Sequence, residues 1–321
     1  MAKKAVKYAL KDESFNPLDN LVMEESDLAP YANRYRDDDN GIWLYQGNCL
    51  EILDAINKKY PEGRFDMIFA DPPYFLSNGG ITCHAGKMVR VDKGDWDKSR
   101  GPELNHEFNL EWLRRCQQAL KPNGTIWVSG TQHVIFSVGY AMQQLGMKIL
   151  NDIIWEKPNP PPNLSCRYFT HSTETIIWAA KNSKSKHVFN YDLMRKTNNG
   201  KQMKSVWTMQ APKADEKLHG KHPTQKPISL AERCILASTR RDSLVLDPFC
   251  GSGTTGVAAL RWGRKFVGID LDEKYLNDLA KQRLTDELHT IKNISASRGI
   301  NTGQYSSRLS DKNYKHGLEI P

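Results

Sequence analysis

Two stretches of the chain end an apolar run on an aspartate that is followed by proline. They are "MIFADPPYF" (67–75) and "LVLDPFCGSGTT" (244–255). Proline fixes its own φ angle and lacks an N–H group, so each pair should stop a strand and hold the preceding carboxylate just beyond its end. A carboxylate in that place can accept hydrogen bonds from a ligand or take part in proton transfer. Asp71 and Asp247 are therefore the first candidates for chemistry.

The glycine-rich stretch predicts a cofactor site. Gly251 and Gly253 allow a tight turn with close backbone approach, and the helix expected after them presents free N–H groups. Asp270 ends the next expected strand, where an acid commonly accepts hydrogen bonds from ribose hydroxyls. Asp247 would repel a pyrophosphate but can bind an ammonium group. The pattern therefore favours S-adenosylmethionine over a dinucleotide.

The Asp-Pro-Pro-Tyr stretch fits the activation of an exocyclic amino group on a nucleobase. Such a nitrogen is a poor nucleophile because its lone pair is delocalised into the ring. Asp71 and the backbone carbonyl of Pro72 can accept its two hydrogens, and Tyr74 offers a flat ring on which a base taken out of the duplex can stack. Alone, the stretch could be no more than a rigid turn; beside the cofactor turn, the catalytic interpretation is favoured. A cytosine-C5 enzyme would need a Pro-Cys nucleophile, and the sequence contains no such pair.

Strands and helices alternate along most of the chain. We expect strands over 43–47, 64–70, 125–130, 148–157, 174–181, 243–249 and 265–270, and helices over 49–60, 109–124, 133–145, 227–239, 254–263 and 273–288. This order predicts an α/β fold with a doubly wound, mostly parallel sheet. Ligands bind beyond the carboxyl ends of such strands, so both Asp-Pro ends can face one crevice.

Two parts of the chain qualify this simple picture. A single strand follows the glycine-rich turn, so the strand order is predicted to be circularly permuted relative to a fold that begins with such a turn. Residues 75–103 are rich in Gly, Asp and Lys without a clear period, so we expect a long loop there.

Composition bounds the class of protein. The chain has 321 residues, of which 39% are hydrophobic and 26% charged, as is usual for a globular protein with a sizeable core. It has neither an apolar run of membrane-spanning length nor a signal-peptide core, so we expect a cytoplasmic protein without membrane contact. Six cysteines without a C-x-x-C pair and nine histidines without a ligand pattern indicate free thiols and no metal.

The positive charge is concentrated in one segment. Residues 181–226 hold eleven Lys or Arg and three acids, a net charge of +8 that equals the net charge of the whole chain. Most such runs are solvated loops. Because a site for nucleobase chemistry is expected elsewhere, a polyanion-binding segment is the favoured interpretation.

These motifs together resemble a known family, the β-class amino-methyltransferases of DNA (DNA methylase N4/N6 family), over about residues 40–287. The matching stretches are "ADPPYFLSNGG", "VDKGDWDKS", "NPPPNLSCRYFTHSTET", "GKQMKSVWT", "GKHPTQKP" and "LDPFCGSGTTG". They are most similar to DpnA-type adenine-N6 methyltransferases of restriction systems that act at GATC. Cell-cycle and HinfI-type enzymes acting at GANTC match less well after Tyr74.

The resemblance implies roles for individual residues. The catalytic motif falls on Asp71, Pro72, Pro73 and Tyr74. Cofactor binding falls on Asn48, Cys49, Asp71, His222, Thr224, Gln225, Lys226, Asp247, Pro248, Phe249, Gly251, Ser252, Gly253, Thr254, Thr255 and Asp270. DNA contacts are expected from Trp96, Lys184, Lys186, Arg195, Lys196, Lys201 and Lys204. The family usually has aspartate where this chain has Asn48, so the contact to the cofactor's adenine would use an amide or shift to Cys49.

The composition of the two ends of the chain, together with the resemblance over the residues between them, implies a domain plan. It gives a polar arm (1–40), a catalytic half (41–180), a small basic target-recognition insertion (181–221), a cofactor-binding half (222–289) and a disordered polar tail (290–321). DNA, duplex or single-stranded, is the expected partner; a homodimer and a cognate restriction endonuclease are further implied partners.

Several alternatives stay open. N4-cytosine methylation needs the same hydrogen-bond chemistry, although Asp71 rather than Ser before Pro-Pro-Tyr favours adenine. Adenine methylation at GANTC is a second alternative. Methylation of RNA or of a protein glutamine is a third, and the basic insert disfavours the protein. A catalytically silent DNA-binding subunit is a different class of protein, which the complete motifs disfavour.

Overall fold

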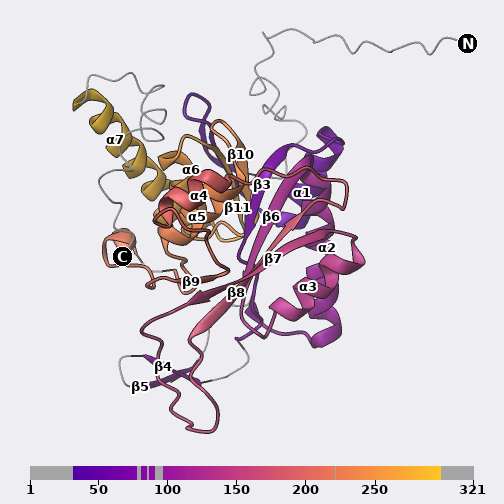
Figure 1. Cartoon of the computed structure of the whole chain (residues 1–321), viewed down its shortest axis with the longest axis vertical. Coiled ribbons are helices and arrows are strands. Elements are labelled where there is room, and N and C mark those ends of the chain that lie inside the picture. Colours follow the sequence, from indigo (N-terminus) through magenta and orange to yellow (C-terminus); the bar gives the residue numbers. More distant parts are fainter. Residues whose placement is uncertain (1–31, 78–80, 85–86, 91–96, 221, 298–321) are drawn as a thin grey trace, which may run out of the picture.

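The computed structural model describes residues 32–77, 81–84, 87–90, 97–220 and 222–297. Within these residues the main sheet has nine strands in the order β1-β2-β11-β10-β3-β6-β8-β7-β9 (Figure 1). Their bounds are Ala32–Asp37 (β1), Ile42–Gln46 (β2), Phe65–Ala70 (β3), Leu120–Gly130 (β6), Lys148–Glu156 (β7), Thr173–Ala180 (β8), Val206–Thr208 (β9), Leu244–Asp247 (β10) and Lys265–Asp270 (β11). The five strands from β2 to β6 run parallel, whereas β1, β8 and β7 introduce antiparallel pairs.

Helices cover both faces of this sheet. One face carries α1 (Cys49–Lys59), α2 (Pro102–Ala119) and α3 (Ile135–Gln144), and the other carries α4 (Tyr191–Thr197), α5 (Ile228–Ser238), α6 (Thr254–Arg261) and α7 (Lys281–Ser297), the last preceded by a π-helical turn over Tyr275–Ala280. Strand β3 shows why: its residues are apolar on both sides, with Ile68 in the core under α1–α3 and Met67 in the core under α5–α7. The predicted doubly wound, mostly parallel α/β fold is therefore confirmed.

The topology brings the two Asp-Pro strand ends together. Strand β10 pairs in parallel with β3, with Val245 opposite Met67, and with β11 on its other side. Asp71, Asp247 and Asp270 consequently follow or end three neighbouring strands at the same edge of the sheet, which we call the carboxyl edge. The permuted chain order that the sequence suggests stays a prediction.

Some segments have more regular structure than the sequence suggested. Strand β1 lies within the expected polar arm and pairs with β2, and α7 continues beyond residue 289 into the expected tail. The expected loop 75–103 contains a hairpin, β4 (Ile81–His84) with β5 (Lys87–Arg90), and its last residues begin α2. Helix α2 starts seven residues earlier than expected because Pro102 suits the first turn of a helix. Residues 1–31 and 298–321 lie outside the described part.

The basic segment is part of the main fold. Its strand β9 adds to the sheet beside β7, and its helix α4 packs on α5. Met194, Trp207 and Met209 from this segment are buried in the core under α5–α7. The backbone that carries its charges is therefore held in place by the sheet. No helix in the described residues is long and apolar enough to span a membrane.

Candidate active site

A cavity of about 630 Å³ lies at the carboxyl edge, over the ends of β3, β10 and β11. Its volume is typical of sites that enclose a small ligand. Fifteen of the sixteen predicted cofactor-binding residues line it, all except Gly253, and so does the catalytic-motif residue Pro73. The structure thus brings together residues that lie more than 200 positions apart in the sequence, from Asn48 to Asp270.

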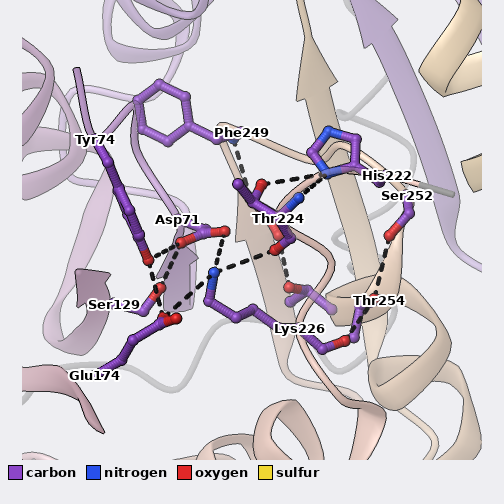
Figure 2. Close-up of polar contacts among 12 residues, drawn as sticks. Asp71, Tyr74, Ser129, Glu174, His222, Thr224, Lys226, Phe249, Ser252 and Thr254 are labelled. Carbon is purple, nitrogen blue, oxygen red and sulfur yellow. Dashed lines mark hydrogen bonds and ion pairs between the residues drawn. The ribbon is translucent and has the colours of Figure 1, made fainter. Parts of the chain in front are cut away.

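Asp71 is the centre of a polar cluster on one side of this cavity (Figure 2). Its Oδ1 accepts hydrogen bonds from the Tyr74 hydroxyl at 2.8 Å and the Ser129 hydroxyl at 2.6 Å. Its Oδ2 accepts one from the Lys226 ammonium at 2.5 Å. Both carboxylate oxygens are therefore engaged, and a new hydrogen-bond donor can reach Oδ2 most directly by taking the place of Lys226.

Glu174, a residue that the sequence analysis missed, completes the cluster. It begins the buried part of β8, is 9% exposed, and pairs with Lys157 and, at 3.7 Å, with Lys226. Burial alone would raise the pKa of Glu174, but Lys226 and Lys157 outweigh it and hold that pKa below its ordinary value. In the same way burial would lower the pKa of Lys226, but Asp71 and Glu174 raise it. The cluster is a buried network of alternating charges.

Tyr74 lies inside this network and has no place in the cavity lining. Burial, with the nearby Asp71 and Glu174, raises the pKa of Tyr74 well above its ordinary value. The hydroxyl therefore stays protonated and acts as a hydrogen-bond donor. The ring is 5% exposed, and the Lys226 ammonium lies 5.3 Å from its centre. That ammonium contacts Asp71 Oδ2 and the Tyr74 ring together, which are the two places predicted for the amino group and the ring of a target base.

A buried carboxylate fixes the backbone after Tyr74. Asp97 is fully buried and accepts hydrogen bonds from the N–H groups of Tyr74 (2.8 Å), Phe75 (2.8 Å) and Leu76 (3.1 Å). It also accepts one from the Ser77 hydroxyl. These bonds hold Phe75 at a φ of +58°, a conformation that side chains other than glycine rarely adopt. Asp97 therefore fixes the turn that ends the predicted catalytic motif.

Asp247 sits on the other side of the cavity in different surroundings. Its carboxylate accepts hydrogen bonds from the Phe249 N–H at 3.0 Å and the Thr255 hydroxyl at 2.6 Å. No salt bridge to Asp247 occurs in the described residues. Burial raises the pKa of Asp247 to about 7, despite the opposing effect of these two hydrogen bonds. The site thus holds an acid that a positive ligand would ionise.

The glycine-rich turn wraps around Asp270. The Gly251 N–H donates to Asp270 Oδ2 at 2.6 Å, and the Asp272 N–H donates to Oδ1 at 2.9 Å. Gly251 and Gly253 have φ angles of +50° and +75°, which explains the glycines at these positions. A side chain on Gly253 would also collide with the backbone of Ala280. The buried Arg283 donates a hydrogen bond to the Ser252 carbonyl at 2.7 Å and so fixes this part of the turn.

The charges of the lining select a cationic ligand. Five acids line the cavity (Asp71, Asp247, Asp270, Asp272 and Glu273), whereas Lys226 is its one Lys or Arg. This excess of carboxylates would repel a phosphate and attract a ligand with a sulfonium and an ammonium group. Within the described residues no group of three or more His, Cys, Asp or Glu could hold a metal ion.

The predicted DNA contacts are spread over the molecule. Lys184 and Lys186 flank Ser185, whose hydroxyl bonds the Pro122 carbonyl near the amino end of β6. Ser129, which contacts Asp71, is seven residues further along β6, so these lysines lie toward the opposite end of that strand from the polar cluster around Asp71. All six described cations of the set are exposed. Trp96 lies outside the described residues.

The rest of that set lies along α4 and before β9. Arg195 and Lys196 lie in the last turn of α4. This helix begins beside the carboxyl end of α5, where the Asn190 N–H donates to the Ala237 carbonyl. Lys201 follows α4, and Lys204 directly precedes the residues that join β9 to β7. Their role in DNA binding stays a prediction.

Some lining residues carried little or no sequence signal. The cavity is also lined by Gly47, Phe69, Phe108, Cys250, Leu271, Asp272, Glu273 and Tyr275. Asp272 and Glu273 could have been inferred from their closeness to Asp270. Tyr275 packs edge-on against the predicted site residue His222, with ring centres 4.4 Å apart, which is a tertiary contact that spacing does not reveal.

Comparison with known proteins gives one family. A family model described as DNA methylase matches residues 65–282. The chain is 60% identical over 262 residues to the Type II methyltransferase M2.DpnII of Streptococcus pneumoniae, a match that covers 81% of this chain and 94% of that relative.

Solved structures show the same arrangement of elements. The M1.HpyAVI–SAM complex superimposes with a TM-score of 0.58 at 30% identity, covering 76% of this chain and 98% of that one. The PvuII DNA methyltransferase, described as cytosine-N4-specific, gives a TM-score of 0.57 at 19% identity, covering 79% and 93%. The second likeness concerns the fold alone.

Proposed function

The chain belongs to the DNA methylase family, and on this premise we propose that it is an S-adenosylmethionine-dependent DNA adenine-N6 methyltransferase. Its target would be an adenine in a short site, GATC, as in the restriction–modification enzymes that the sequence resembles. The observation that carries the proposal is geometric. The carboxylate of Asp71 and the acid-lined glycine-rich turn open into the same cavity, from neighbouring strands of one sheet.

The cavity supports the cofactor assignment. Its volume, its carboxylate excess and the position of Asp270 fit a ribose together with a cationic methionine part. When bound, S-adenosylmethionine supplies a methyl group on a positively charged sulfur. Asp270 would accept hydrogen bonds from the ribose hydroxyls, and Asp247 would face the ammonium.

The catalytic cluster supports the reaction. Asp71 would accept a hydrogen bond from the exocyclic amino group of the target base, which moves the nitrogen lone pair out of conjugation with the ring. The carbonyl of Pro72 is proposed as the second acceptor. Oδ2 of Asp71 holds the Lys226 ammonium, so the amino group would reach this oxygen most directly by taking the place of Lys226. The proton lost by the nitrogen can pass to Asp71.

Partners follow from the reaction. DNA is the proposed macromolecular substrate, and the cytoplasm is the proposed place of action. A homodimer and a cognate restriction endonuclease remain proposals that rest on the resemblance.

Transfer of labelled methyl groups tests the function. Purified protein is incubated with labelled S-adenosylmethionine and unmethylated DNA, and the product is digested to nucleosides and mapped. We expect N6-methyladenine confined to GATC. N4-methylcytosine would change the target base while keeping the mechanism, and label at GANTC would change the site.

A matched variant makes this experiment specific. Asp71→Ala should abolish transfer, whereas Asp152→Ala alters an exposed carboxylate on β7 and should not. No transfer to any DNA by a protein that still binds the cofactor would overturn the proposal.

A further inference from the structure

The loop that joins β7 to β8, residues 157–172, has a tip unlike the rest of the surface. Phe169 is 96% exposed, the largest value among the exposed large hydrophobic residues in the described part of the chain. Tyr168 is 60% exposed and Leu164 48% exposed beside it. Single exposed apolar side chains are common, but two aromatic rings and a leucine on one short tip form a contact surface.

The loop is anchored in the catalytic cluster. The Lys157 N–H donates to the Ser172 carbonyl at 2.8 Å and closes its base. Lys157 pairs with Glu174, and Glu174 accepts a hydrogen bond from the Tyr74 hydroxyl at 3.1 Å. Figure 1 shows the connection between β7 and β8 reaching beyond the body of the sheet. The tip therefore projects from the carboxyl edge, beside the site where a target base must enter.

The tip holds a defined shape. The side chain of Asn163 accepts a bond from the Ser165 N–H at 3.0 Å and donates one to the Tyr168 carbonyl at 2.5 Å. Pro158, Pro160, Pro161 and Pro162 restrict the chain leading to it. A preorganised tip loses less conformational entropy when it binds a partner.

The charge of the loop suits a polyanion. Residues 157–173 contain no Asp or Glu, and they contain Lys157 and Arg167. Lys157 is used inside the protein, whereas Arg167 is exposed two residues before Phe169. Exposed aromatic rings with an arginine nearby are how proteins stack on nucleobases while holding the phosphate backbone.

We infer that the 157–172 loop is a DNA-contacting element of this protein, in which Phe169 stacks on a nucleobase near the target and Arg167 contacts the backbone. This inference rests on the proposed function, because it names how the same site holds its DNA. It assigns the contact nearest the catalytic cluster to a segment outside the strongly basic region 181–226.

A pair of aromatic variants tests the stacking. Phe169→Ala should lower kcat/KM for DNA methylation by about 10- to 100-fold, the range expected for loss of one stacked base. Tyr140→Ala removes another exposed ring, on α3 and outside both the 157–172 loop and the basic segment, and should stay within about threefold of wild type. Both variants should bind S-adenosylmethionine as the wild type does, which excludes misfolding.

Duplex and single-stranded oligonucleotides are used in parallel. Losses on both indicate stacking on the target strand, and a loss on duplex alone indicates a wedge between base pairs; either supports the inference. Equal kcat/KM for Phe169→Ala and wild type on both substrates would overturn it and leave the proposed function intact.

Cross-linking gives a readout that does not depend on catalysis. DNA substituted with 5-iodouracil next to the target is irradiated with the wild-type protein, and the linked peptide is identified by mass spectrometry. We expect links to residues 164–169. Links confined to residues 181–221 would contradict the inference. A protein that cross-links through this loop but methylates no DNA would instead separate the contact from the proposed function.

Discussion

Asp71 and Asp247 lie at the carboxyl ends of two neighbouring strands, yet their surroundings differ. Each ends or directly follows a parallel strand, precedes a proline and lines the same cavity. Asp71 has the ammonium of Lys226 at 2.5 Å, whereas Asp247 has neutral donors, the Phe249 N–H and the Thr255 hydroxyl. One carboxylate has a cation built into the protein, and the other is left to meet a cation that the ligand brings.

This difference matches the two roles proposed for the aspartates, catalysis for Asp71 and cofactor recognition for Asp247. A catalytic acceptor must be present before the substrate arrives, so its charge is balanced by Lys226 in the meantime. An acid that recognises a cationic cofactor gains most from a ligand if no protein cation competes for it. In the proposed mechanism the same Asp-Pro pair would thus serve different chemistry because of residues far away in the sequence, above all Lys226.

The largest effect is expected when Asp71 loses its charge. Asp71→Asn should reduce kcat for methyl transfer by about 10³-fold, because the amide accepts a hydrogen bond less well and cannot take up a proton. Cofactor affinity should change little, and Asp152→Asn should leave both parameters near wild type. The variants are compared by single-turnover kinetics and cofactor titration. If the Asp71→Asn protein has the same kcat as the wild type, Asp71 has no part in the mechanism.

Removal of the built-in cation should destabilise the fold. Lys226→Met leaves the buried Asp71 and Glu174 without their shared cation, so the free energy of unfolding should fall by about 3 kcal/mol. Lys121→Met breaks a half-exposed pair with Asp66 and should cost less than about 1 kcal/mol. Denaturant titration measures both. Equal stability of the two variants would show that Lys226 has no special place in the charge network.

Asp247→Asn should affect binding more than chemistry. An amide keeps an acceptor for the Phe249 N–H but loses the attraction for an ammonium, so Kd for S-adenosylmethionine should rise about 10- to 100-fold. At saturating cofactor, kcat should fall much less than in Asp71→Asn. Calorimetric titration gives the affinity. The comparison between the two aspartates fails if both substitutions lower kcat equally and leave Kd unchanged.

Much of this site could be predicted from the sequence, since its main signals are local. Proline after aspartate, glycines at positive φ and the strand–turn–helix order are each short-range features, and they located Asp71, Asp247, Gly251 and Asp270. The parallel sheet then places these residues together, because neighbouring parallel strands share a carboxyl edge.

Residues that act through long-range contacts could not be found in this way. Glu174 meets Tyr74 100 positions away, and Arg283 meets Ser252 from a helix whose pattern gives no hint of it. A glutamate at the start of the apolar run "ETIIWAA" was the one available signal for the first. Hydrophobic periodicity reports burial, but it does not report which buried charges pair.

Charge counting likewise says nothing about the face on which a charge lies. Residues 181–226 hold eleven cations, yet Lys184 and Lys186 lie near the amino end of β6, opposite the carboxyl edge. Residues 157–172 carry only two, and their tip lies at the carboxyl edge. The direction of each strand decides the position, because β8 runs antiparallel to β6 and carries the chain away from the site.

The smallest expected effect in the comparison of Asp71 with Asp247 is the pH dependence of cofactor binding. Because the pKa of Asp247 is raised to about 7, a fraction of the cofactor-free protein carries a proton there at neutral pH. A cationic ligand favours the ionised form, so binding should release that proton, and Kd should rise about tenfold as the pH falls from 8 to 6. Above pH 8 the acid is already ionised, and Kd should level off. Titrations in buffers of different ionisation enthalpy measure the proton release directly. Asp247→Asn is the control: its profile should be flat over this range, and an unchanged pH dependence in this variant would assign the titration to another group in the cavity.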